Sequence, residues 1–256
     1  MNKKILAILS ATLSLVLMGA SCSSQTTTSG NEGTKDGSVV ISITDAAANM
    51  GNVTAISLTE NKIELHNKTE GWVTASDSTN TFKLLELKAE NKSALVATVD
   101  VAPGTYDQLR MSVVNVKVTT KDGVTAEAKL PSNQLTLKSN VEVHSGATSS
   151  VNMDFLADVS LHVTGKGKFI FAPVVKIENR TNATVKVNAD NSVSIQNGTV
   201  VESATKGMDV DGSMKSDFQF GTDSQLEIDG DGSITTTVKV KVPSPIKTNL
   251  KEKVTD

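Results

Sequence analysis

Alternating carboxylates near the C-terminus are the residues whose spacing comes nearest to metal chemistry. Asp229 and Asp231 alternate with glycines, Glu227 precedes them, and residues 209–213 repeat the pattern. Calcium takes about six to eight oxygen ligands, and alternate carboxylates can converge on it. However, the twelfth position counted from Glu227 is Val238, where a calcium loop needs an acidic residue, and Asp-Gly is also a hairpin turn. We therefore predict no metal and no cofactor; calcium, if bound, would use Asp229 and Asp231.

The residues needed for nucleophilic catalysis do not stand in a recognisable arrangement. His66, His144 and His162 are the only histidines, lie far apart and fall on strand-like segments. No nucleophile-elbow or His-Glu-x-x-His motif occurs, so the base that would activate a nucleophile is not evident. The sequence predicts a protein that is not an enzyme. The enzymatic alternative is glycoside hydrolysis by two carboxylates, for which no pair stands out.

Arg110 is a charged residue that needs a partner. It lies within an apolar run that is predicted to be a strand, and Asp154 stands beside Phe155 in another. A guanidinium in such a place needs carboxylate partners. We predict a structural ion pair in which Arg110 pairs with Asp154 first and Asp45 second, pinning strand ends. The alternative is that these residues form a ligand-binding cluster.

Trp72 and Tyr106 are the only large amphipathic aromatic side chains. Trp72 is predicted to lie at a turn between strands, where an exposed ring could form a platform for a sugar. Alternatively, its ring closes the edge of the core, since such rings bury a large apolar area. The aromatic content of 3% argues against an extended sugar-binding surface.

The N-terminus carries a targeting signal that ends at Cys22, the only cysteine. Lys3 and Lys4 are followed by an apolar run over residues 5–18, which is shorter than the roughly 20 residues of a membrane span. The small residues 19–21 then lead to Cys22, as in the bacterial lipobox. The pattern predicts a signal peptide over residues 1–21, and its resemblance to the lipobox implies cleavage before Cys22, lipidation of its thiol and acylation of the new N-terminus. The alternative is an ordinary secretory signal followed by a free thiol.

Short strands with turns between them must position these residues. Apolar and polar residues alternate from Gly37 onwards, which is typical of half-buried strands. In the longest run, residues 105–120, the phase of the alternation changes, which predicts a bulge near Val113-Val114. Residues 169–177 are apolar on both faces and predict a central strand, with a bulge or interruption at Pro173.

The pattern changes along the chain and predicts several units. Residues 22–36 are rich in Ser, Thr and Gly and predict a flexible tether. Residues 37–178 predict an antiparallel β-sandwich, and residues 183–242 predict a second, smaller β unit with few large apolar side chains. Residues 243–256 predict a disordered tail. The fold class is therefore all-β.

Charge and composition limit the partners. The chain carries 25 basic and 28 acidic residues, a net charge of −3, which becomes −5 when Lys3 and Lys4 leave with the signal. Only Arg110 and Arg180 are arginines, and no basic stripe occurs. Nucleic acid is therefore not predicted as a partner. The predicted partner is the membrane, reached through the lipid anchor.

Several motifs together resemble one known family. They appear in the family's order over residues 37–178: GSVVISITDAA, Gly71-Trp72-Val73, Leu84-Leu85-Glu86-Leu87, PGTYDQLRM at 103–111, Lys121-Asp122-Gly123, Leu130-Pro131-Ser132, Met153-Asp154-Phe155 and APVVKI at 172–177. This segment resembles the domain of unknown function family 4382 of exported bacterial and archaeal proteins. Ala47 stands where the family usually has a proline. The resemblance implies a transthyretin-like or carbohydrate-binding-like β-sandwich and brings no established activity.

These observations lead to three functional hypotheses. The first is an exported lipoprotein, anchored in the outer membrane or at the cell surface, whose non-enzymatic sandwich lies outside the cytoplasm and binds a glycan or a surface protein. The second is a structural or adhesion module that assembles through exposed sheet edges. The third is the carboxylate-based glycoside hydrolase. An exposed Trp72 in a groove would favour the first hypothesis.

Overall fold

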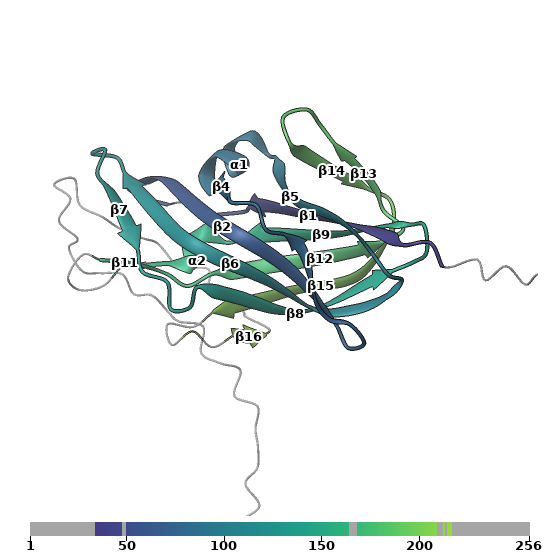
Figure 1. Cartoon of the computed structure of the whole chain (residues 1–256). Helices are drawn as coiled ribbons and strands as arrows, with labels where there is room; N and C mark the ends of the chain where they lie inside the picture. Colours follow the sequence, from purple (N-terminus) through teal and green to yellow (C-terminus); the bar gives the residue numbers. More distant parts are fainter. Residues whose placement is uncertain (1–33, 48–49, 164–167, 209–211, 213, 217–256) are drawn as a thin grey trace, which may run out of the picture. The chain divides into compact units, whose positions relative to one another are not determined.

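The protein is described here by a computed structural model, shown in Figure 1, over residues 34–47, 50–163, 168–208, 212 and 214–216. One compact unit begins at Thr34. Its strands form two main sheets that pack face to face as a sandwich, so the predicted all-β sandwich is confirmed. None of the helices in the described ranges has the length and hydrophobicity of a membrane span.

Sheet A is the larger layer and is built around β1. In the described residues its strands lie in the order β13 (Thr184–Val187), β14 (Ser192–Gln196), β5 (Ser93–Val101), β1 (Gly37–Asp45), β9 (Thr148–Phe155), β12 (Val174–Thr181), β15 (Thr199–Met208) and β16 (Met214–Ser216). β1 pairs antiparallel with β5 but parallel with β9. The sheet is therefore mixed rather than purely antiparallel, because the chain passes through the whole of sheet B between β1 and β9 and so can return in the same direction.

Sheet B is the layer opposite and is dominated by two long antiparallel strands. Its strands are β3 (Gly71–Ser76), β2 (Val53–Asn67), β6 (Gly104–Thr120) and β7 (Thr125–Ala128), with β4 (Asn80–Lys83) also paired to β2 and β8 (Gln134–Val143) also paired to β6. A separate short pair contains β10 (Leu161–Val163) and β11 (Phe169–Phe171). Two short helices, α1 (Leu84–Glu90) and α2 (Ala157–Ser160), complete the described elements.

The core lies between the sheets because alternate residues of each strand point inward. On β1 these are Val39, Ile41 and Ile43, and on β2 they include Ile63 and Leu65, all fully buried. Each large apolar side chain buried in this way contributes about 1.5–3 kcal/mol relative to its exposed state. The polar residues between them on β2 and β6 therefore face away from the core, on the outer face of sheet B.

The phase change in β6 is produced by the predicted bulge. Thr59 pairs with Asn115 and Glu60 with Val113, so Val114 has no partner on β2 and is 43% exposed. Because one residue is skipped, Val113 and Val116 both face the core. The bulge near Val113-Val114 is confirmed.

The segment at Pro173 is interrupted, as the sequence predicted. β11 ends at Phe171, and β12 begins at Val174. β12 then lies in the interior of sheet A, between β9 and β15. Proline cannot donate a ladder hydrogen bond, which explains why the break falls there.

The predicted boundary between a sandwich and a second β unit at residues 183–242 is wrong for its described part. β15 pairs with β12 from Val174↔Gly207 to Thr181↔Thr199, and β14 pairs with β5. The strands after Thr181 therefore extend sheet A at both of its edges. They carry few large apolar residues because they complete an existing sheet rather than bury a core of their own. Residues 217–242 and the predicted tail at 243–256 lie outside the described residues.

Candidate functional site

The outer face of sheet B gathers polar and aromatic side chains from four adjacent strands. Glu64 lies between two buried residues of β2, and Arg110 lies between two buried residues of β6, so both point outward. The ladder pairs Glu64 with Arg110 and His66 with Trp72. Across β3, β2, β6 and β8 this gives two rows: Trp72, His66, Gln108 and Lys138; and Thr74, Glu64, Arg110 and Thr136.

Arg110 is held by Glu64. Its Nε and Nη2 both lie 2.7 Å from Oε2 of Glu64, while Nζ of Lys62 lies 2.8 Å from Oε1. The Glu64 side chain is 7% exposed and that of Arg110 is 23% exposed, so the pair is largely shielded from water. Burial opposes the charged form of Glu64, but the hydrogen bonds from Lys62 and Arg110 outweigh it and hold the pKa of Glu64 below its usual value.

Trp72 lies against the same guanidinium. The Cζ atom of Arg110 is 3.9 Å from the centroid of the Trp72 ring, which is a cation–π contact. The His66 ring packs on Trp72 as well, at 5.0 Å between centroids and a tilt of 59°. Trp72 is therefore a partly buried member of an outward-facing cluster, and it neither closes the core nor stands as a bare platform.

His66 and Asp107 complete the cluster. Nδ1 of His66 and Oδ1 of Asp107 are 2.6 Å apart, and this hydrogen bond is the main reason that the pKa of Asp107 is lowered. Asp107 reaches His66 because the ladder between β6 and β2 is irregular there, where Gln108 pairs with His66 but Tyr106 pairs with Asn67. We call Glu64, His66, Trp72, Asp107 and Arg110 the outer cluster.

The predicted pairing of Arg110 with Asp154 or Asp45 is wrong. Arg110 lies on sheet B, whereas Asp45 ends β1 and Asp154 lies on β9, both in sheet A. The alternation around Arg110 places it on the face opposite Leu109 and Met111, but it could not choose between carboxylates on different sheets. Glu64 is the partner because it stands directly opposite on the neighbouring strand.

Asp45 has a structural role of its own at the end of β1. Its Oδ1 accepts hydrogen bonds from the backbone N–H groups of Ala47, at 3.1 Å, and Ala157, at 3.2 Å. The residue is 3% exposed, and among the described residues its Oδ2 has no partner. Burial raises the pKa of Asp45 to about 6, against the lowering effect of the two N–H donors, and the nearby Asp154 adds to the rise.

Asp154 points away from the core, because its neighbours Met153 and Phe155 on β9 are both buried in it. It stands opposite Thr44 on one side and Lys176 on the other. Burial raises the pKa of Asp154, while the positive charges of Lys176 and Lys88 oppose the rise. Asp45 and Asp154 thus lie near each other but form no ion pair with Arg110.

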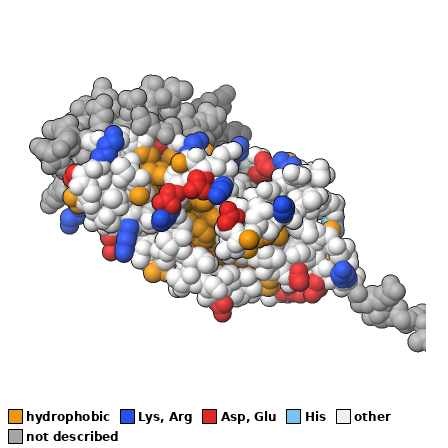
Figure 2. All heavy atoms as spheres, turned by 90° about the horizontal axis from the view of Figure 1, so that it is seen from above, with side chains coloured by type: hydrophobic (Ala, Val, Ile, Leu, Met, Phe, Trp, Pro, Cys, Tyr) orange, Lys and Arg blue, Asp and Glu red, His pale blue; other side chains and the backbone are white. Residues whose placement is uncertain are grey.

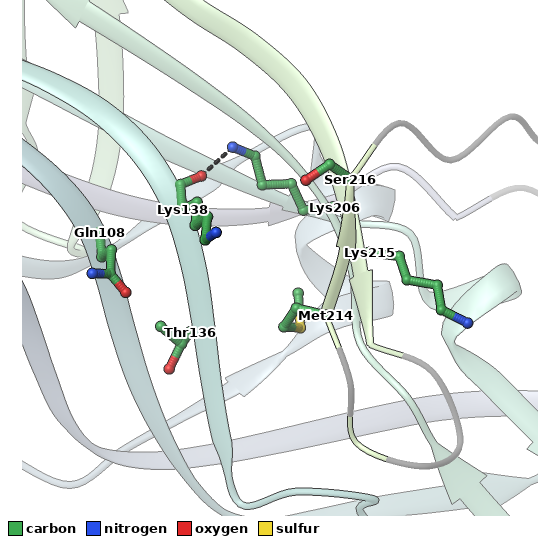
Figure 3. A pocket seen from close by; sticks show the side chains of 7 residues that line it. All are labelled: Gln108, Thr136, Lys138, Lys206, Met214, Lys215 and Ser216. Atoms are coloured by element: carbon green, nitrogen blue, oxygen red, sulfur yellow. Dashed lines mark hydrogen bonds between the residues drawn. The ribbon is translucent and has the colours of Figure 1, made fainter. Parts of the chain in front are cut away.

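A cavity of about 280 Å³ adjoins the outer cluster. Figure 3 shows its lining side chains, which come from β6, β8, β15 and β16: Gln108, Thr136, Lys138, Lys206, Met214, Lys215 and Ser216. Gln108 and Thr136 are ladder neighbours of His66 and Arg110, so the cavity continues the same surface. We call it the lysine cavity.

The far side of the lysine cavity is fixed by hydrogen bonds between the two sheets. The ammonium of Lys206 donates to the backbone carbonyl of Lys138 (dashed in Figure 3) and lies 2.5 Å from Oε1 of Glu202. Oε2 of Glu202 accepts from the backbone N–H of Asn140 at 2.6 Å, and Asn179 donates to the carbonyl of Asn140 at 2.9 Å. Side chains of β12 and β15 therefore form hydrogen bonds with backbone groups along the edge of β8 that is not paired with β6.

The remaining predicted site residues are not brought together. Cys22, Asp229 and Asp231 lie outside the described residues. Within the described ranges, no group of three or more His, Cys, Asp or Glu side chains could hold a metal ion. On the face seen from above in Figure 2, lysine and arginine side chains are interspersed with aspartate and glutamate, so this face carries no patch of a single sign.

Comparison with known proteins gives one match. The sequence matches the family described as Domain of unknown function (DUF4382) over residues 36–173, just over half of the chain. No curated protein and no solved structure matched it. The matched segment contains every residue of the outer cluster, whereas Lys206 and the β16 wall of the lysine cavity lie beyond its end.

Proposed function

The chain belongs to the DUF4382 family, and we propose that it is a non-enzymatic binding module whose ligand, a glycan, lies on the outer face of sheet B. The protein is exported and held at the cell envelope by lipid on Cys22, with the sandwich outside the cytoplasm. A surface protein is the other partner that the same face would suit.

The observation that carries the proposal is the fixed guanidinium of Arg110. Two of its nitrogens are engaged by Glu64, and one face of the group lies on Trp72. Among the described residues, its Nη1 has no hydrogen-bond acceptor, so its donors remain available in a set orientation. A donor that is already held in place loses little side-chain freedom when a ligand binds, which favours affinity.

The arrangement also suits an extended ligand. Adjacent strands are about 4.8 Å apart, so the four strands that carry Trp72, His66, Gln108 and Lys138 present a row of about 14 Å. Aromatic, imidazole, amide and cationic groups occur along that row, and the neighbouring row adds the hydroxyls of Thr74 and Thr136. Such a mixture is typical of sites that bind polar ligands through several hydrogen bonds and one apolar contact.

The anchor follows from the N-terminal sequence. The apolar run over residues 5–18 is too short to span a bilayer, and small residues separate it from Cys22. Two or more acyl chains hold a protein firmly at a membrane, whereas one chain holds it marginally. Residues 22–36 would place the sandwich at a distance from the bilayer.

A glycan array tests the proposal. The mature chain carrying Cys22→Ser is applied to neutral and acidic glycans, beside the same chain with Trp72→Ala and a control with Arg180→Ala. Binding that is lost with Trp72→Ala and kept with Arg180→Ala supports the outer face as the site. Retention of the full signal by Trp72→Ala, or absence of binding to every glycan, would refute it.

One observation favours assembly through a sheet edge as a second candidate function. β13 is the terminal strand of sheet A in the described residues, and three of its four residues are exposed, including Val187 at 42%. An unpaired edge of this kind can add a strand from another chain. Val185→Pro would block that pairing, and sedimentation of the mature chain before and after the change tests it.

A further inference from the structure

We infer that the lysine cavity binds the carboxylate of an acidic sugar, so that the ligand is a polyanionic glycan rather than a neutral one. The inference rests on the proposed function, because it names the ligand class of the same outer face. The family match assigns no ligand to this cavity, and part of the cavity wall lies beyond residue 173, where the match ends.

The lining of the cavity differs in charge from the rest of the chain. It contains three lysines, Lys138, Lys206 and Lys215, and no carboxylate, although the chain as a whole has a net charge of −3. Concave sites lined by one sign of charge concentrate the opposite ion. Lys206 is paired with Glu202, and the Lys215 side chain points away from Gln108 and Thr136 in Figure 3, so the positive charge that faces the cavity comes from Lys138.

Lys138 is the cation that a ligand would meet. The ammonium of Lys206 is already held by Glu202 and by the carbonyl of Lys138, and Lys206 is 7% exposed. By contrast, the Lys138 side chain is exposed and has no hydrogen-bond or ion-pair partner among the described residues. Lys206 thus holds the strand in position, and Lys138 supplies the free charge.

Neutral donors surround that charge. The Gln108 amide and the Thr136 hydroxyl line the cavity, and neither has a side-chain hydrogen-bond partner among the described residues. A carboxylate accepts several hydrogen bonds at once through its two oxygens. Lys138, Thr136 and Gln108 could therefore share one carboxylate between them.

Arg110 supplies a second positive charge near Lys138 on the same surface. Arg110 is the ladder partner of Thr136, and Lys138 is the ladder partner of Gln108, so the two cationic residues are diagonal neighbours on adjacent strands. Diagonal positions of this kind are about 7–8 Å apart. A polymer with repeated carboxylates could place one at Lys138 and direct another toward Nη1 of Arg110.

Polygalacturonate and its fully methyl-esterified form provide a matched pair of probes, because they share one backbone and differ in charge. The mature chain carrying Cys22→Ser is titrated with each, and so are variants that also carry Lys138→Gln or Lys117→Gln. Lys117 is a suitable control because it is exposed on the same face, farther along β6, and does not line the cavity. Melting temperatures check that both variants are folded.

We expect tighter binding of polygalacturonate than of the ester, and weaker binding as salt is added. Lys138→Gln should lower the affinity for polygalacturonate by about 10-fold, since a hydrogen bond to a charged group is worth about that factor. Lys117→Gln should leave the affinity unchanged. Equal binding of the two polymers, or equal effects of the two substitutions, would overturn the inference while leaving glycan binding intact. Binding only to neutral glycans would also overturn the inference and leave glycan binding intact. Absence of binding to any glycan would instead remove the proposed function, and the inference with it.

Discussion

Replacement of Arg110 by alanine should destabilise the sandwich by about 2–3 kcal/mol. The guanidinium makes two 2.7 Å contacts with Oε2 of Glu64 and stacks on Trp72 at 3.9 Å. Breaking a fully buried ion pair costs about 3–5 kcal/mol, and breaking an exposed one costs about 0–1 kcal/mol. Arg110 is 23% exposed, and Glu64 keeps Lys62 at 2.8 Å after the change, which places the expected cost between these limits.

Urea unfolding of the mature chain with Cys22→Ser measures this cost. A double-mutant cycle with Glu64→Ala isolates the pair, and its coupling should be about 1–2 kcal/mol. Arg180→Ala is the matched control, because Arg180 is the only other arginine and pairs with Glu178 on its own strand, with side chains 29% and 34% exposed. Arg180→Ala should lower the free energy of unfolding by about 0–1 kcal/mol.

Two outcomes would refute this reasoning. A coupling between Arg110 and Glu64 below about 0.5 kcal/mol would mean that the pair contributes nothing beyond its separate side chains. Equal costs for Arg110→Ala and Arg180→Ala would mean that burial and the Trp72 contact add nothing. A cycle between Arg110 and Asp154 should show coupling near zero, because the two residues lie on different sheets.

Four further predictions follow from the structure and the sequence. Because the folded pKa of Asp45 is raised to about 6, the protonated form stabilises the fold below about pH 4, and this contribution, up to about 3 kcal/mol, is lost as pH rises through 6. Urea unfolding from pH 4 to 7 should therefore vary less with pH in Asp45→Asn, and an unchanged pH profile would contradict the assignment. Ending the chain after residue 182 removes β15 and exposes the edge of β12, so thermal unfolding should lose its cooperativity or shift to much lower temperature; a melt like that of the full chain would contradict this. Cys22→Ser should move the protein from the membrane to the soluble exported fraction, and unchanged fractionation would argue against the lipid anchor. Chelator should leave the melting temperature of the mature chain unchanged, whereas a large drop would make Asp229 and Asp231 calcium ligands.

The strands of sheet B could be predicted from local pattern, because alternation reports which side of a strand is buried. The bulge at Val114 could also be predicted, since the phase change occurs within one strand. The same alternation sets Glu64 and Arg110 on one face, between Ile63 and Leu65 and between Leu109 and Met111.

What the pattern could not supply is the pairing between strands. Choosing Glu64 over Asp154 as the partner of Arg110 requires the register of β2 against β6, which shifts at several points along the ladder and depends on contacts distant in sequence. The placement of β15 beside β12 could not be predicted either. The alternation within a strand of modest hydrophobicity does not indicate which edge of a sheet it will pair with. The lysine cavity depends on both facts, since β16 follows β15 around the edge of β8.

The position of β1 determines how late the sandwich can form. β1 leads the described strands, yet one of its two neighbours is β9, and the hydrogen bond from Ser42 to Asn152 closes a loop of 110 residues. Proteins dominated by such distant contacts fold slowly, on the scale of milliseconds to seconds. β1 therefore remains unpaired on one side until most of the domain has been synthesised. In the proposed export, this delay would keep the polypeptide unfolded during its passage across the membrane, and the sandwich would form only after β9 had crossed.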